Sequence, residues 1–222
     1  MPNPIKPKFK TEWLAILSLI LAAGLSFYFY KNFPAQVPIH WNINGEVDNY
    51  GSAAFSAFFL PILMLVIYLV FLILPYLDPR RERYSEFSQA YHLVKSGVIV
   101  FMFSLFILIG LAGLGYGINI SFWVPVMVGV LFMGLGLVMK QVKPNWFMGI
   151  RTPWTLSSEK VWTKTHDLAA PVMSLGGILI ASTGFFSSPA IKMSLFVGAI
   201  VIIAIGLPLY SYFLYRQERT GK

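Results

Sequence analysis

The sequence predicts an all-α, polytopic membrane protein with six transmembrane helices, both termini in the cytoplasm and a small structured extracytoplasmic loop. Three observations support this fold class: the composition, the lengths of the apolar runs and the placement of the basic residues. Of the 222 residues, 57% are hydrophobic and only 12% are charged, and the mean hydropathy is +0.69. Since soluble domains carry about a quarter charged residues, this composition indicates a chain embedded in a lipid bilayer.

The distribution of charge and the cysteine count argue against a nucleic-acid-binding protein and against a protein with disulfides or thiolate-bound metals. A net charge of +8 is compatible with nucleic-acid binding only if the basic residues gather on a soluble face, and here they flank apolar runs. We therefore predict no direct nucleic-acid binding. The chain has no cysteine, which excludes disulfides and thiolate-ligated metals, and we predict no cofactor.

Six apolar runs are long enough to cross the bilayer, whose hydrocarbon core of about 30 Å needs about 20 helical residues. They cover residues 13–30, 54–77, 93–115, 122–139, 168–187 and 190–214. The first run follows a basic start, as in a signal peptide, but it has the length of a full span and lacks a clean cleavage site, so we expect a retained helix. Small residues let membrane helices approach closely, and we expect packing faces at Gly129, Gly134, Gly136, Gly176 and Gly177.

The basic residues orient the chain in the membrane. With the N-terminus inside, all of the 17 Lys and Arg residues except Lys31 and Lys192 fall on the cytoplasmic side, as the positive-inside rule requires. The spans themselves contain essentially no ionisable residue, which disfavours proton-coupled transport. We divide the chain into an N-terminal two-helix module, 1–92, with the extracytoplasmic loop 31–53, and a four-helix module, 93–222, with the cytoplasmic loop 140–167.

The extracytoplasmic loop predicts a small hairpin. Apolar and polar residues alternate from 39 to 44, as in a short strand. Asn44-Gly45 is a strong tight-turn pair, because both residues tolerate positive φ. A compact outer loop is where an external ligand first meets such a protein, so a peptide-recognition surface is one interpretation. His40, Glu46 and Asp48 are too weak a pattern to indicate a metal site, and we predict none.

The cytoplasmic loop 140–167 is polar but rich in tryptophan, and it carries most of the functional signal. Its tryptophans, Trp146, Trp154 and Trp162, are expected to anchor it at the membrane interface. Either Thr155 or Ser157 offers an N-cap oxygen for a helix that continues into the fifth span.

Three residues of that helix share one face. Glu159 lies in the first turn, where the helix dipole favours a carboxylate, and Trp162 and His166 follow at spacings of three and four. This face is either a docking surface or packing at the membrane boundary. Arg151 is expected to pair with a carboxylate, Glu159 being the nearest in sequence.

The loop does not predict an enzyme. His166-Asp167 resembles an acid–base pair, but neighbouring residues on a helix point about 100° apart, and general acid–base catalysis needs groups within hydrogen-bond reach of one proton. The sequence contains neither a nucleophile motif nor HExxH. We therefore expect a non-enzymatic protein.

Two stretches resemble known families. Residues 145–166, NWFMGIRTPWTLSSEKVWTKTH, with the two helices after them resemble the SdpI family of bacterial membrane proteins, and the likeness covers about 135–214. That family is named for immunity to a sporulation-delaying killing peptide. The pattern P-x-x-x-P-I-H-W-N-x-x-G-x-x-D-x-x-G over 34–51 resembles an uncharacterised domain often fused ahead of it.

The resemblance implies an integral membrane immunity protein that gives resistance to an antimicrobial peptide and that, in the best-known system, also signals by holding a small repressor at the membrane. By this resemblance the candidate cytoplasmic docking residues are Asn145, Gly149, Arg151, Thr152, Pro153, Trp154, Thr155, Glu159, Trp162 and His166. The candidate extracytoplasmic recognition residues are Pro38, His40, Trp41, Asn42, Gly45, Asp48 and Gly51. A small-solute transporter or channel and a membrane-embedded enzyme are the alternative functions.

Overall fold

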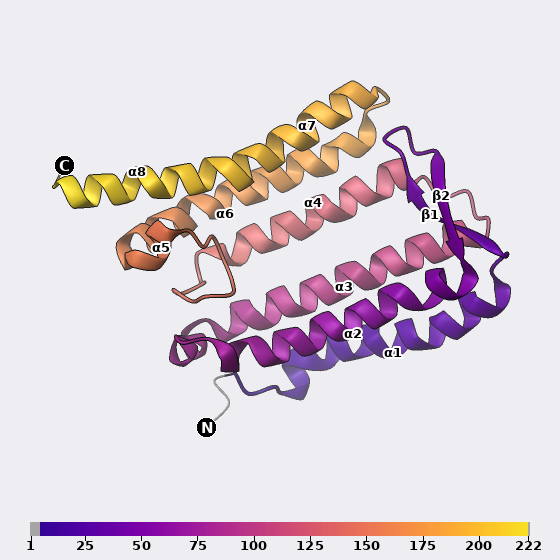
Figure 1. Ribbon diagram of the computed structural model, residues 1–222, viewed down its shortest axis with the longest axis horizontal. Helices are drawn as coiled ribbons and strands as arrows, with labels where there is room; N and C mark the ends of the chain where they lie inside the picture. Colours follow the sequence, from indigo (N-terminus) through magenta and orange to yellow (C-terminus); the bar gives the residue numbers. More distant parts are fainter. Residues whose placement is uncertain (1–4, 222) are drawn as a thin grey trace.

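The computed structural model describes residues 5–221, which form a helical bundle with one small sheet (Figure 1). Within these residues, six helical stretches are long and apolar enough to cross a membrane, which confirms the predicted all-α architecture with six spans. The elements in chain order are α1 (Phe9–Asn32), β1 (Gln36–Trp41), β2 (Val47–Ser52), α2 (Ala53–Leu77), the 3-10 helix η1 (Arg81–Phe87), α3 (Ser88–Gly113), α4 (Ile120–Met139), α5 (Pro153–Ser157), α6 (Glu159–Ser182), the 3-10 turn η2 (Thr183–Phe185), α7 (Pro189–Val201), the π-helical turn η3 (Ile202–Gly206) and α8 (Leu207–Thr220).

Several spans have other ends than the sequence predicts, among them the fifth and the sixth. The fifth begins at Glu159 instead of residue 168, because the Ser158 side chain caps the helix by accepting from Val161 N at 3.2 Å. The sixth is one continuous helical stretch through α7, η3 and α8. Its π-turn comes directly before Pro208, which has no N–H to donate to the preceding turn.

The two ends of the bundle carry different elements (Figure 1). The β1–β2 hairpin covers one end, which we call the hairpin end, together with the α3–α4 and α6–α7 connections. The opposite end, which we call the motif end, carries η1, α5, the loop 140–152 and the first and last described residues. Between the ends, large apolar side chains face outward, for example Leu137 at 75% and Leu175 at 65% exposure. Such broad apolar faces suit lipid acyl chains.

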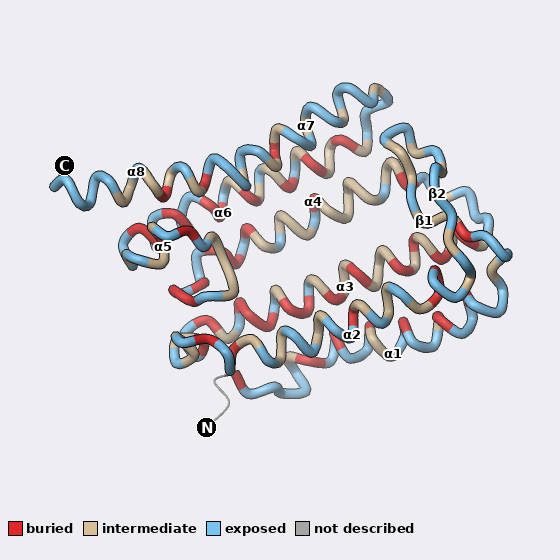
Figure 2. Tube along the Cα trace, viewed as in Figure 1, coloured by how far each residue is buried: buried red, intermediate tan, exposed pale blue. Residues whose placement is uncertain are grey.

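Three apolar clusters hold the bundle together. One joins α1, α2 and α3 around Met64 and Phe106, and a second joins α4, α6 and the last span around Met173. The third lies at the motif end, where Tyr84 and Trp162 meet. Buried positions accordingly recur along α3 and α6 (Figure 2). Because α3 packs against α1, α2 and α4, the division of the chain at residues 92 and 93 stays a prediction.

Helices α4 and α6 approach each other at glycines. A Cβ added at Gly129 would collide with the carbonyl oxygen of Gly177, and one added at Gly136 would lie 2.8 Å from the carbonyl oxygen of Ala170. These contacts agree with the predicted packing role of small residues. A Cβ at Gly134, in contrast, meets no described atom within 4 Å, so this glycine does not make a close helix contact.

The hairpin has the predicted position and a different turn. Strands β1 and β2 pair antiparallel from Gln36–Ser52 inward, with register shifts around His40. The carbonyl of Asn42 accepts from Gly45 N at 2.9 Å, and Gly45 has φ of 84°. No described residue other than a glycine has positive φ, so the expectation that Asn44 shares this conformation is wrong. The geometry is that of a three-residue loop closed by a left-handed glycine.

Candidate functional site

The two predicted groups of site residues lie at opposite ends of the molecule (Figure 1). Pro38, His40, Trp41, Asn42, Gly45, Asp48 and Gly51 belong to the β1–β2 hairpin. Asn145, Gly149, Arg151, Thr152, Pro153, Trp154, Thr155, Glu159, Trp162 and His166 belong to the motif end, in the loop before α5, in α5 itself and in the first turns of α6. They therefore form two sites separated by the length of the bundle.

Several hairpin residues build the hairpin itself. The Asn42 side-chain oxygen accepts from Asn44 N at 2.9 Å and from Glu46 N at 3.0 Å, which closes the turn. His40 Nδ1 lies 2.5 Å from Asp48 Oδ1 across the strands. Both side chains are well exposed, at 65% and 42%, so this pair contributes little to stability. No group of three His, Asp or Glu residues within 5–221 is arranged to hold a metal ion.

A cavity of about 520 Å³ lies under the hairpin and joins it to the helices behind. The hairpin contributes His40, Trp41 and Asn42 to its wall, whereas Pro38, Asp48 and Gly51 lie outside it. Most of the remaining wall is apolar, formed by Ile43, Ile120, Val124, Pro125, Met193 and Phe196. The hairpin end thus offers a space suited to an apolar guest.

Lys192 of α7 is the one residue in the wall of this cavity with a permanent charge. Its Nζ donates to Ser121 Oγ of α4 at 2.5 Å, and it makes no ion pair with a carboxylate within the part of the chain that the structure describes. A half-buried cation without an anionic partner is a binding group for an anion.

At the motif end, Asn145 organises the loop that follows α4. It is fully buried. Its Oδ1 accepts from Phe147 N at 2.9 Å and from Met148 N at 2.6 Å. Its Nδ2 donates to the carbonyls of Lys143, at 2.8 Å, and Met148, at 2.9 Å. One amide side chain thus replaces the regular hydrogen bonds that this irregular loop lacks.

Asp78, at the end of α2, ties η1 to this loop and was not anticipated from the sequence. Its Oδ2 accepts from Tyr84 OH and from Trp146 N, each at 2.8 Å. Its Oδ1 accepts from Arg80 N at 2.7 Å. Asp78 is only 2% exposed, and hydrogen bonds to a buried carboxylate are strong.

His166 is a structural residue. It is 1% exposed and stacks on Trp162 with ring centroids 4.1 Å apart. Its Nε2 accepts from Ile150 N at 3.1 Å, and its Nδ1 donates to the Trp162 carbonyl at 2.8 Å. Both ring nitrogens are therefore engaged with backbone in the neutral form, which leaves neither free for acid–base chemistry.

Gly149 and Trp162 complete the same cluster. Gly149 has φ of 102°, and a Cβ there would collide with His166 Nε2, so glycine is required for conformation and for space. Trp162 is 1% exposed and its Nε1 donates to the Val142 carbonyl at 2.9 Å. The expected interfacial role of Trp162 is therefore wrong, while that of Trp146, which is 47% exposed, stays a prediction.

The helix that continues into the fifth span, α6, is capped by Ser158 and not by Thr155 or Ser157, so the predicted N-cap is wrong. A separate short helix, α5, precedes it. Thr152 is its N-cap, accepting from Thr155 N at 3.1 Å, and Pro153 occupies the first turn. The Thr155 hydroxyl bonds back to Thr152 N at 2.9 Å, so the two threonines form a reciprocal cap. The hydroxyls of Thr152 and Ser211 lie 2.9 Å apart, which joins α5 to α8.

The predicted pairing of Arg151 with Glu159 is wrong. Glu159 Oε1 accepts instead from Arg83 of η1, at 2.6 Å. Arg151 is exposed and its Nη1 donates to the Trp146 carbonyl at 2.8 Å. Trp154 packs against Tyr212 of α8, with ring centroids 5.0 Å apart. Arg151 is thus the charged motif residue that presents its guanidinium to solvent.

A buried ionic network between α1, α2 and α3 contradicts the expectation that the spans lack ionisable residues. Lys95 Nζ lies 2.6 Å and 2.7 Å from the two carboxylate oxygens of Glu12. Tyr68 OH donates to Glu12 Oε2 at 2.9 Å, and His92 Nδ1 lies 3.1 Å from Oε1. Glu12 is 3% and Lys95 1% exposed. Buried ionisable groups in membrane spans are costly unless paired, and here they pair.

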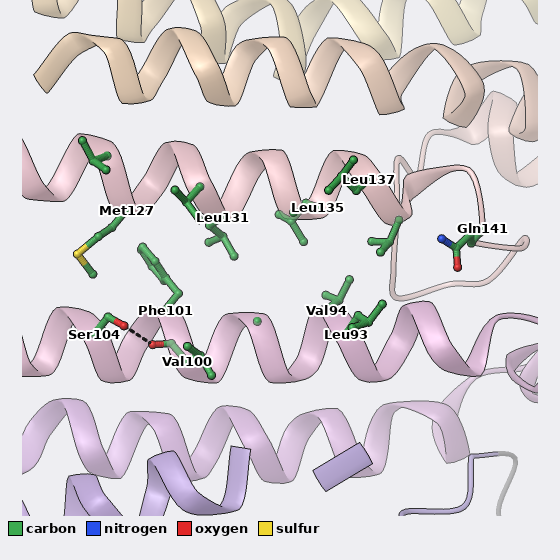
Figure 3. A pocket seen from close by; sticks show the side chains of 15 residues that line it. Leu93, Val94, Val100, Phe101, Ser104, Met127, Leu131, Leu135, Leu137 and Gln141 are labelled. Atoms are coloured by element: carbon green, nitrogen blue, oxygen red, sulfur yellow. Dashed lines mark hydrogen bonds between the residues drawn. The ribbon is translucent and has the colours of Figure 1, made fainter. Parts of the chain in front are cut away.

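An apolar groove of about 630 Å³ runs between α3 and α4 (Figure 3). Side chains such as Phe101, Met127 and Leu131 point into it from both helices (Figure 3). Ser104 is the one hydroxyl in its wall, and it donates to the Val100 carbonyl at 2.9 Å. The groove therefore presents acyl-chain chemistry and no row of polar groups for a hydrophilic solute.

Two protein-family models match the segments that contain the two sites. Residues 141–211 match the SdpI/YfhL protein family, a match that contains the whole Asn145–His166 cluster and ends at Ser211. This part of the chain is similar to the SdpI/YfhL family. Residues 17–65, which include the hairpin, match a domain of unknown function, DUF1648.

Similarity to one known protein extends over nearly the full chain. Immunity protein SdpI of Bacillus subtilis (strain 168) is 27% identical over 208 residues, which are 94% of this chain and 97% of that protein. No solved structure matches. With this similarity and six candidate spans in the described residues, the protein is a multi-pass protein of the cell membrane. The cluster at the motif end is thus part of the family segment, and the hairpin is part of the DUF1648 segment.

Proposed function

We propose that this protein is a non-enzymatic membrane immunity protein that protects its cell against an antimicrobial peptide. The observation that carries this proposal is the similarity to Immunity protein SdpI over 94% of the chain. Two features of the molecule weigh against the alternatives. His166 has both ring nitrogens bonded to backbone, which argues against an enzyme, and the α3–α4 groove lacks the polar lining that a solute pathway needs.

In this proposal the hairpin end faces outward and the motif end faces the cytoplasm. The placement of the basic residues supports this orientation, since Lys31 and Lys192 are the two Lys or Arg residues near the hairpin end. A peptide that arrives from outside then meets the cavity under the hairpin first. The apolar wall receives its apolar side chains, and Lys192 receives a carboxylate.

The test is a growth assay in a sensitive bacterium challenged with a sporulation-delaying killing peptide. We expect expression of the chain to raise the peptide concentration that stops growth, and Lys192→Gln to remove much of this protection at unchanged membrane levels. Lys31→Gln is the matched control, because Lys31 is the other basic residue of that end and does not line the cavity. Equal protection by both variants would exclude Lys192 from recognition, and no protection by the unmodified chain would reject the immunity function.

The same cells test the orientation. The chain has no cysteine, so a single introduced cysteine reports its own side of the membrane. Asn44→Cys at the hairpin should react with an impermeant maleimide in intact cells, and Ser157→Cys in α5 should react only after lysis. Both positions are exposed.

We further propose that the motif end relays occupancy by holding a cytoplasmic repressor. Arg151 and Trp146 support this role, because both are exposed at that end, whereas Asn145, Thr152 and Thr155 are buried in the fold. Arg151→Ala should abolish repressor recruitment, measured by co-purification with membranes, and leave the melting temperature nearly unchanged. Arg81→Ala, a neighbouring basic substitution on η1, serves as the comparison. Full recruitment by Arg151→Ala would exclude this surface.

A further inference from the structure

A second cavity, of about 610 Å³, opens at the motif end between the segment before α1 and the start of α3. We call it the lysine pocket. Lys6, Lys8 and Lys10 line it from one side. Neutral polar side chains line it from the other, among them Ser88 and Gln89. No carboxylate is part of its wall.

The three lysines keep their charges unneutralised by the protein. None of them forms an ion pair within residues 5–221. Of the acids on α1 and η1, Glu12 is paired with Lys95 and Glu86 with Arg83, and Glu82 is not part of the pocket wall. The pocket therefore has a positive potential that a ligand anion would compensate.

The wall of the lysine pocket changes from charged to apolar along the helices. Trp13 and Leu14 of α1 and Leu93 of α3 line the same cavity, and they are 45%, 42% and 52% exposed. These residues belong to stretches able to span the membrane. An anion-binding mouth continuous with an acyl-chain surface matches one class of molecule, a phospholipid with an anionic headgroup. Trp13 is placed where tryptophans lie at the headgroup level.

A buried ionic network lies behind the inner wall of the pocket. His92 lines the pocket and lies 3.1 Å from Glu12 Oε1, so the buried network of Glu12, Lys95 and Tyr68 backs the cavity. The segment that carries the lysines is attached to this wall through Lys8, whose backbone N–H donates to Thr11 Oγ1 at 3.1 Å.

We propose that the lysine pocket binds the headgroup of an anionic phospholipid, with an acyl chain along Trp13, Leu14 and Leu93. The bound lipid bridges the segment before α1 and the start of α3. This role is independent of the immunity function.

The test uses the purified full chain and native mass spectrometry, with phosphatidylglycerol and phosphatidylcholine as probes. We expect selective retention of phosphatidylglycerol, and we expect its affinity to fall by at least about tenfold in the Lys6→Gln/Lys8→Gln/Lys10→Gln variant. The matched control, Lys140→Gln/Lys143→Gln/Lys160→Gln, removes the same charge from exposed lysines outside the pocket and should keep the selectivity. The Lys6→Gln/Lys10→Gln variant, which retains the N-cap residue of α1, should show a smaller loss.

Three results would overturn the proposal. An equal loss in the control variant would mean that the effect is general surface charge. Unchanged selectivity in the pocket variant would mean that the lysines do not bind the lipid. Displacement of phosphatidylglycerol by soluble glycerol phosphate at the same concentration would mean that the pocket takes free anions and that the apolar wall contributes nothing.

Discussion

Replacing Lys95 with methionine is expected to lower the free energy of unfolding by about 3 kcal/mol or more, because it leaves the Glu12 carboxylate buried without its cation. Glu12 is 3% exposed and receives both of its shortest contacts from Lys95 Nζ, at 2.6 Å and 2.7 Å. The hydrogen bond from Tyr68, at 2.9 Å, does not supply charge. The loss is measured as a shift in the unfolding transition of the purified protein in mixed detergent micelles.

The double variant Glu12→Gln/Lys95→Met shows whether the stability lost in Lys95→Met comes from the unpaired charge of Glu12 or from changed packing. Removing both charges of a buried pair is often nearly neutral, because the desolvation cost disappears with the attraction. We therefore expect the double variant to recover most of the lost stability. Lys31→Met, at an exposed position outside this network, should change stability little. If the double variant is as unstable as Lys95→Met, the network contributes by shape and not by charge pairing.

Replacing Asn145 with alanine is expected to cost about 3 kcal/mol and to disorder the loop between α4 and α5, since each unsatisfied buried polar group costs about 1–3 kcal/mol. The substitution removes the hydrogen-bond partner of the N–H groups of Phe147 and Met148. It also removes the donor to the carbonyl groups that accept from Asn145 Nδ2 in the unmodified protein. Rapid proteolysis or hydrogen exchange in the loop measures the local effect, and detergent unfolding measures the global one.

Asn44→Ala is the matched control for Asn145→Ala. Asn44 is exposed in the hairpin turn, where only its backbone N–H is engaged with Asn42, and surface substitutions of this kind change stability by about 0.5 kcal/mol or less. A loop that stays protected in Asn145→Ala would show that the contacts of Asp78 with Tyr84 and Trp146 suffice to hold it.

The spans were predictable from the sequence because membrane thickness sets a minimum apolar length. The ends of the spans were less predictable. The first turns of α6 are polar, so hydropathy alone does not show that the helix begins after the N-cap Ser158. The hairpin was predictable from strand alternation and Gly45.

The partners of the motif residues were not predictable, because they lie far away in the sequence. Glu159 binds Arg83, and the loop after Asn145 binds Asp78 through Trp146 N. No local pattern carries such pairings. The Glu12–Lys95 pair was missed because a single charge at the margin of a long apolar run does not stop the run from qualifying as a span. A signal was present, however, since a lone acid and a lone base in otherwise apolar runs need partners.

The α3–α4 groove lies between two sets of contacts, one at each end of the bundle. At the motif end, the first three helices are fastened to the rest by Arg80 on the Leu156 carbonyl at 2.9 Å and by Arg83 on Glu159. At the other end the hairpin reaches across to α4, where a Cβ on Gly45 would lie 2.9 Å from that of Ser121. The middle, lined by Gly97 and other apolar positions, has open volume. We therefore expect these contacts to hold the two ends together, and we expect the middle of the α3–α4 interface to be able to widen without breaking them.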